Sequence, residues 1–141
     1  MDSSTKREVI LEHYQNPVNR VNDDVEGYVK VNSNNESCID NINLFIKFND
    51  NKIEDIKFSG EACAISTAST SIMIQNLIGM DIDEALDYIN NFTKMLNEEE
   101  YEAKDFKDAV VFDETYKQAN RRTCVTLPYK GIIKAIEDYK K

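Results

Sequence analysis

The sequence predicts a small α+β domain in which helices cover one face of a three-stranded antiparallel sheet. Three consecutive segments alternate apolar and polar residues with period two, which is typical of half-buried strands. Helical spacing of apolar residues comes before and after them, and this order favours a meander packed against helices. The chain has 141 residues. We therefore expect one domain over residues 1–141, large enough to bury a core of its own.

The first half of the chain contains one expected helix and the three expected strands. Residues Thr5–Gln15 have helical spacing, with Ser4 or Thr5 as the N-cap. Pro17 ends this helix, because the residue before a proline avoids the helical region. Asn49–Asn51 has the composition of a tight turn between antiparallel strands. The alternation places the strands over residues 28–32, 42–48 and 53–58.

The second half of the chain is predicted to form helices. A helix from Cys63 to about Gly79 is rich in small and hydroxyl residues, so we expect it to pack closely or to lie over a site. Asp81 is the expected N-cap of the next helix, which continues to about Asn97. Two further helices are expected, a short one over residues 112–122 and a final one with Pro128 near its first turn.

Composition excludes some classes of partner. The formal net charge of −9 repels nucleic acid and anionic membranes, so we expect neither as a partner. No apolar run is long enough to cross a bilayer, and no apolar signal-peptide core follows the N-terminus. A cytoplasmic location is expected, where cysteines are better interpreted as thiols or metal ligands than as disulfides.

The three cysteines are the best candidates for chemistry. Cys38 lies two positions before Asp40, so both side chains share a face of an extended backbone. Cys63 stands at an expected helix start, where the helix dipole stabilises a thiolate. Cys124 follows two arginines near another expected start, and guanidinium groups also favour a thiolate. Three sulfurs and one carboxylate oxygen could form a tetrahedral zinc site. Spacing alone leaves the alternative open, because a single free cysteine is often a small buried hydrophobe.

Four segments resemble, in order, the motifs of the U-type (IscU/NifU N-terminal-like) iron–sulfur cluster assembly proteins. They are HYQNPVN (13–19), CID (38–40), GEACAIS (60–66) and RRTCVTL (121–127). The Isc-type scaffold carries a histidine immediately before its third cysteine, and this chain has Thr123 there. The separation of Cys63 from Cys124, 61 positions (124 − 63), is also longer than in the Isc type. Both features resemble the SufU branch.

The resemblance implies a site and a partner. It implies that Cys38 receives sulfur as a persulfide from a pyridoxal-phosphate-dependent, SufS-like cysteine desulfurase, and that the product feeds downstream iron–sulfur assembly proteins. Arg121 matches a basic position of the family and is expected to position a thiolate or the partner. Ile39 stands where the family usually has glycine, and a β-branched residue there favours an extended loop. The implied zinc ligands are Cys38, Asp40, Cys63 and Cys124.

Three functions fit these residues. The first is a SufU-type zinc-dependent sulfurtransferase. The second is a scaffold on which a [2Fe–2S] cluster is assembled transiently by the same ligands, and the third is an interaction domain with a structural zinc. His13, the single histidine, is expected inside the first helix on a packed face, with a structural or partner-contact role. The hydroxyl residues of Ser66–Ser71 are best explained by close helix packing, because no free base accompanies them.

Overall fold

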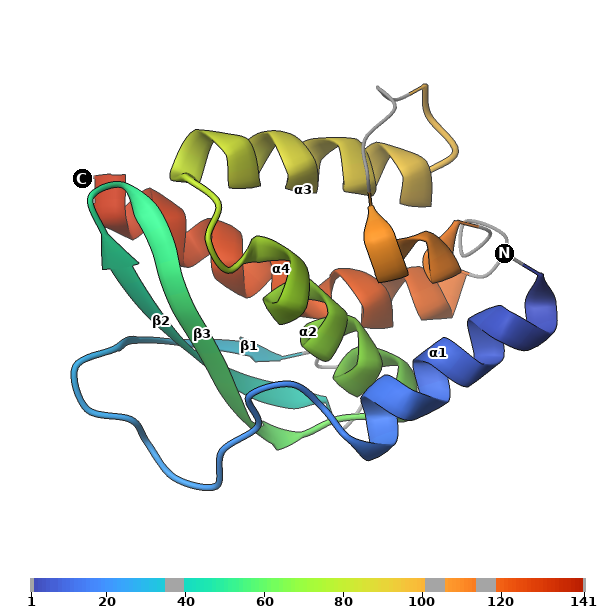
Figure 1. Ribbon diagram of the computed structural model, residues 1–141, viewed down its shortest axis with the longest axis horizontal. Coiled ribbons are helices and arrows are strands. Elements are labelled where there is room, and N and C mark those ends of the chain that lie inside the picture. Colours follow the sequence, from blue (N-terminus) through green and yellow to red (C-terminus); the bar gives the residue numbers. More distant parts are fainter. Residues whose placement is uncertain (1, 35–39, 101–105, 114–118, 141) are drawn as a thin grey trace.

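A computed structural model describes residues 2–34, 40–100, 106–113 and 119–140 of the chain (Figure 1). Along the chain an N-terminal helix comes first, three strands follow, and the remaining helices come after them. The N-terminal helix lies beside the first helix that follows the strands (Figure 1). The α+β prediction is confirmed. In chain order the elements are α1 (Ser3–Gln15), β1 (Val29–Asn34), β2 (Asn41–Asn49), β3 (Lys52–Glu61), α2 (Ala64–Leu77), α3 (Ile82–Leu96), the 3-10 helix η1 (Lys107–Phe112) and α4 (Ala119–Lys140).

The strands form an antiparallel sheet in the order β1-β2-β3. Leu44 of β2 pairs with Val31 of β1 and with Phe58 of β3, which fixes the register of the meander. Asp50 and Asn51 make the turn between β2 and β3, both with positive φ, a conformation that these side chains tolerate better than most. Each strand is a little longer than the alternation predicted, because pairing continues into polar residues at the ends.

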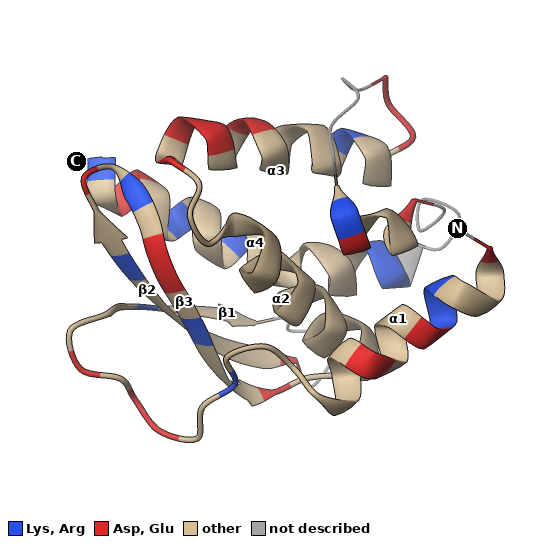
Figure 2. Ribbon diagram, in the orientation of Figure 1, with Lys and Arg blue, Asp and Glu red and all other residues tan. Residues whose placement is uncertain are grey.

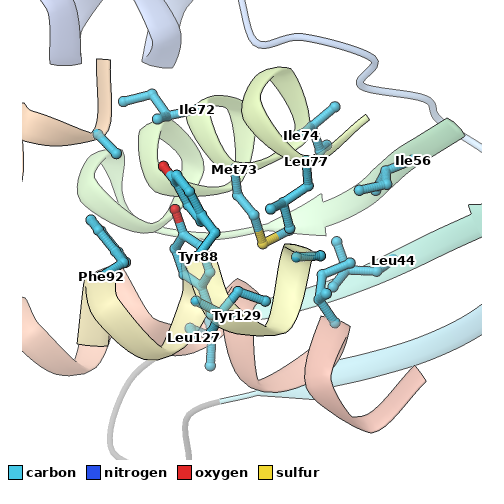
Figure 3. Packing of buried hydrophobic residues seen from close by; sticks show 14 of the residues in the cluster. Leu44, Ile56, Ile72, Met73, Ile74, Leu77, Tyr88, Phe92, Leu127 and Tyr129 are labelled. Carbon is cyan, nitrogen blue, oxygen red and sulfur yellow. The ribbon is translucent and has the colours of Figure 1, made fainter. Parts of the chain in front are cut away.

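Helices α2 and α4 cover one face of the sheet, with α3 outside them (Figure 1). Figure 3 shows Met73 and Leu77 of α2 gathered with Leu44 of the sheet in one buried cluster. α2 carries no charged residue (Figure 2), as expected for a helix that is buried on nearly all sides. α4 lies close to the sheet at Gly131, where an added Cβ would come within 2.7 Å of Leu44 Cδ1.

His13 connects α1 to α2 and η1 by hydrogen bonds. Its ring is buried, with Nδ1 2.8 Å from Ser71 Oγ and Nε2 3.0 Å from Asp108 Oδ2. The Val18 N–H also donates to Ser71 Oγ, at 2.8 Å. The network is consistent if Nε2–H donates to the Asp108 carboxylate and Nδ1 accepts the Ser71 hydroxyl proton. His13 thus joins α1, α2 and η1, and the expected structural role is confirmed.

Of two predicted helix N-caps, one is confirmed and one is corrected. Asp81 caps α3 as predicted, with its side chain accepting the Glu84 N–H at 2.8 Å. α1 begins at Ser3 and its N-cap is Asp2, which accepts the Thr5 N–H at 2.8 Å. The prediction of Ser4 or Thr5 was wrong because Asp2, two residues before Ser4 and three before Thr5, makes the capping bond instead.

The largest correction concerns Pro128. The prediction of a helix over 112–122 followed by a final helix near Pro128 was wrong, because α4 already begins at Ala119 and Pro128 lies inside it. The segment before it is the 3-10 helix η1, and residues 114–118 lie outside the described part of the chain. None of the described helices combines the length and the apolar character that crossing a bilayer requires.

Candidate metal centre

Asp40, Cys63 and Cys124 come together from three different elements. Asp40 directly precedes β2, Cys63 is the N-cap of α2, and Cys124 lies in the first third of α4. One ligand atom from each side chain can be chosen so that all of them lie within 4.8 Å of one another. Asp40 is buried, and both cysteines are half-buried. The structure therefore brings three of the four predicted ligands to one point.

The end of the sheet places Asp40 beside Cys63. Asn41 pairs with Glu61 at the last position of the β2–β3 ladder, so the residues that precede β2 and follow β3 are neighbours. Gly60 permits this approach, because a Cβ there would lie 2.2 Å from the Asn41 carbonyl oxygen, and its φ is +110°. The Cys63 N–H donates to Asp40 Oδ1 at 2.7 Å. The carboxylate thus satisfies one of the free amides at the start of α2.

Ser66 touches all three of these residues. Its hydroxyl oxygen lies 2.7 Å from Asp40 Oδ2, 3.1 Å from the Cys124 carbonyl oxygen and 3.5 Å from Cys63 Sγ. The Ser66 N–H donates to Cys63 Sγ at 3.4 Å, which is the side-chain cap of α2. Explaining Ser66 by helix packing alone missed these contacts. The sequence offered no signal for them beyond the position of Ser66 three residues after Cys63.

The distance between the Asp40 and Cys63 donor atoms fits a tetrahedral zinc ion. Bonds of about 2.3 Å to sulfur and about 2.1 Å to oxygen at the tetrahedral angle place a sulfur and an oxygen about 3.6 Å apart. Asp40 Oδ2 and Cys63 Sγ are 3.6 Å apart. Two thiols and a carboxylate are also donors that zinc prefers, and a fourth ligand would complete the shell.

The protonation of Cys124 differs from the expectation. From the sequence, this residue was expected near a helix start, beside arginines that favour a thiolate. Instead it lies within α4, where burial, and next the hydrogen bond with Cys63, raise the pKa of the Cys124 thiol to about 12. Without a metal the group is a thiol at neutral pH. A metal ion would displace its proton, so that metal binding releases protons and weakens at low pH.

The remaining predicted site residues lie apart from this cluster or outside the described residues. Cys38 and Ile39 belong to the segment 35–39, which the structure does not describe. Arg121 is exposed on α4, one turn before Cys124. His13 contacts Ser71 and Asp108, so its ring nitrogens serve the fold. A ligand role for Cys38 and a catalytic role for Arg121 stay predictions.

Comparisons with known proteins identify the family of this chain. Residues 5–141 match the family described as the NifU-like N terminal domain. The chain is 38% identical to the zinc-dependent sulfurtransferase SufU of Bacillus subtilis, over 92% of this chain and 88% of that protein. It is 35% identical to the iron–sulfur cluster assembly scaffold protein IscU of Streptococcus pyogenes, over 92% of this chain and 80% of that protein.

Solved structures share the fold. A crystal structure described as a scaffold protein for the SUF system of Fervidobacterium islandicum superposes with a TM-score of 0.84 at 32% identity, and covers 92% of this chain and 94% of that chain. The N-terminal NifU-like protein of Brucella abortus gives a TM-score of 0.81 at 22% identity, over 97% and 99% of the two chains, which supports the fold alone. The chain belongs to the NifU-like N-terminal domain family, and within it to the SufU type.

Proposed function

We propose that this protein is a zinc-dependent sulfurtransferase that accepts persulfide sulfur from a pyridoxal-phosphate-dependent cysteine desulfurase and passes it to iron–sulfur cluster assembly. The observation that carries the proposal is the convergence of Asp40, Cys63 and Cys124 in a chain 38% identical to a zinc-dependent sulfurtransferase. Family membership supports a desulfurase of the SufS type as the partner. The reaction needs reduced thiols, which the cytoplasm maintains.

We propose Cys38 as the fourth ligand and as the sulfur acceptor. It lies two positions before Asp40, close enough along the chain for its thiol to reach the three described ligands. Bound zinc would keep the cysteines deprotonated at neutral pH. In the proposed transfer the Cys38 thiolate attacks the outer sulfur of the desulfurase persulfide. A new S–S bond forms on Cys38, the old S–S bond breaks, and the desulfurase cysteine leaves with the electron pair as a thiolate.

Arg121 is proposed to act at the contact with the partner. It is exposed and lies three positions before Cys124 on α4, so both residues share one face of the helix. A guanidinium at that place would attract the anionic persulfide or a carboxylate of the desulfurase. Arg122 lies next to it, and its Nη1 donates to Asn97 Oδ1 at 3.4 Å, which makes it a suitable control.

A scaffold function for a [2Fe–2S] cluster is the second candidate, favoured by the 35% identity to an iron–sulfur assembly scaffold. Metal and sulfide analysis of protein purified without added iron separates the two. Stoichiometric zinc in a colourless protein supports sulfur transfer. A coloured protein that contains iron and acid-labile sulfide supports the scaffold.

The acceptor is identified by mass spectrometry after incubation with desulfurase and cysteine. We expect the mass of one added sulfur on the Cys38 peptide, and strong stimulation of desulfurase turnover that Cys38→Ala abolishes. Arg121→Ala should lower the stimulation at unchanged zinc content, whereas Arg122→Ala should not. Equal stimulation by Cys38→Ala and the parent protein would show that the acceptor is another residue.

A further inference from the structure

Pro128 leaves one backbone carbonyl of α4 without its helical partner. In an α-helix the carbonyl of residue i accepts the N–H of residue i+4, and proline has no N–H. Pro128 lies inside α4, so the carbonyl of Cys124, four residues earlier, receives no such bond. That carbonyl belongs to one of the three described residues of the metal centre.

Ser66 of α2 supplies the missing hydrogen bond. Its hydroxyl oxygen is 3.1 Å from the Cys124 carbonyl oxygen and 2.7 Å from Asp40 Oδ2, and the residue has no exposed surface. A serine hydroxyl has one proton, which here lies between two acceptors and points more closely to the carboxylate. Both acceptors therefore restrict the rotation of the hydroxyl, and the hydroxyl in turn restricts the Asp40 carboxylate.

The neighbouring hydroxyls of α2 do something different. Ser69, which is also fully buried, donates to the Val125 carbonyl at 2.6 Å, and Thr70 donates to the Ser66 carbonyl at 2.8 Å. Within the described residues, both hydroxyls bond to backbone carbonyls only. Ser66 bonds in addition to a side chain of the metal centre. Ser69 thus provides a control with the same side chain, the same helix and the same burial.

We propose that Ser66 is a positioning residue of the metal centre: its hydroxyl holds the Asp40 carboxylate toward Cys63 and Cys124, and it shares its proton with the Cys124 carbonyl, which Pro128 leaves without a helical partner. The inference deepens the proposed function by assigning control of zinc affinity to a hydroxyl outside the ligand set. Asp40 Oδ1 accepts the Cys63 N–H, and Oδ2 accepts the Ser66 O–H. With both bonds in place the Asp40 carboxylate keeps one orientation. Its side-chain rotational freedom is therefore lost on folding, and metal binding does not have to restrict it further.

The test compares Ser66→Ala with Ser69→Ala in the full chain. Zinc affinity is measured by competition with a chromophoric chelator, and the coordination geometry by the visible absorption of the Co²⁺-substituted protein. We expect Ser66→Ala to weaken zinc binding by about 10–100-fold, the usual effect of removing a partner of a metal ligand, and to change the Co²⁺ spectrum. Ser69→Ala should leave both unchanged. Ser66→Thr, which keeps the hydroxyl, should restore the Co²⁺ spectrum and most of the zinc affinity.

The role of Pro128 has a separate readout in urea unfolding of the metal-free protein. Pro128→Ala returns an N–H to α4, so that the Cys124 carbonyl regains a helical partner. Ser66→Ala should therefore destabilise the Pro128→Ala protein less than it destabilises the parent. Additive effects would contradict the shared carbonyl, and equal zinc affinities for Ser66→Ala, Ser69→Ala and the parent would overturn the positioning role. Neither measurement uses the desulfurase, so failure here is distinct from failure of the proposed sulfur transfer.

Discussion

Replacing Gly60 with alanine should open the end of the sheet that carries the metal centre. Gly60 has a φ of +110°, which costs an L-residue about 1–2 kcal/mol. An added Cβ would also lie 2.2 Å from the Asn41 carbonyl oxygen, whereas an ordinary contact needs at least 3.4 Å. The two strands must then separate locally by about 1.2 Å (3.4 − 2.2).

The magnitude follows from the backbone strain and from the pairing that is lost. Gly60 pairs with Ile42, and weakening about two ladder hydrogen bonds costs about 1 kcal/mol each. The sum is about 3–4 kcal/mol for Gly60→Ala, a large fraction of the stability of a small domain. Because Asp40 directly precedes Asn41, the same displacement should move its carboxylate away from Cys63 and weaken zinc binding.

Gly79→Ala is the matched control. Gly79 also has positive φ, +94°, but a Cβ there would meet nothing within 4 Å. It should therefore cost only the strain, about 1–2 kcal/mol, with zinc affinity unchanged. Urea unfolding and chelator competition measure both quantities in both variants. Equal losses of stability, or a Gly60→Ala protein that binds zinc as tightly as the parent, would refute the close-approach argument.

Two further predictions test His13 and Tyr28. His13→Ala removes one buried and one partly buried hydrogen bond between α1, α2 and η1, so it should lower the free energy of unfolding by about 2 kcal/mol at unchanged zinc content; loss of zinc with unchanged stability would instead identify His13 as a ligand. The Tyr28 hydroxyl donates to Asp55 Oδ2 at 2.5 Å, and this bond, with burial next, raises the pKa of Tyr28 to about 12 from 10.0. The raised pKa favours the protonated form in the folded state, so the contribution of this bond is fully present below pH 10 and is lost between pH 10 and about 12. Urea unfolding across that range should show a decline in the parent that Tyr28→Phe reduces, and identical declines would contradict it.

Local patterns were enough to predict the sheet and two of the helix starts, those at Cys63 and Asp81. The strands alternate with period two because one face of the sheet packs against helices, and that requirement acts on every second residue. The cap at Asp81 could be predicted because a capping side chain and the amide it accepts are three residues apart. That the Cys63 side chain also caps α2 was not predicted, because cysteine is not a preferred capping residue.

The wrong prediction at Pro128 shows that local sequence patterns cannot predict a contact between residues far apart in the chain. Proline normally ends or kinks a helix because it removes a hydrogen bond and clashes with the preceding turn. Here the carbonyl that it leaves without a partner accepts a bond from Ser66, which is 58 positions away in sequence. No local pattern contains that compensation. The same distance explains why Ser66 could not be assigned to the metal centre before its neighbours were known.

The fold fixes three of the four proposed ligands through contacts within the described residues, and this predicts how zinc binding responds when each cysteine is removed. Asp40 is fixed by hydrogen bonds from the Cys63 N–H and the Ser66 hydroxyl. Cys63 is the N-cap of α2, and Cys124 lies inside α4. Three protein ligands with one open position are sufficient for zinc in many catalytic sites. Cys38→Ala should therefore retain zinc while losing sulfur acceptance, whereas Cys63→Ala should lose both. Chelator competition compares the zinc affinities of the two variants. If Cys38→Ala loses zinc as completely as Cys63→Ala, then Cys38 is as necessary for zinc binding as the other cysteines, and sulfur acceptance and zinc retention do not depend on different residues.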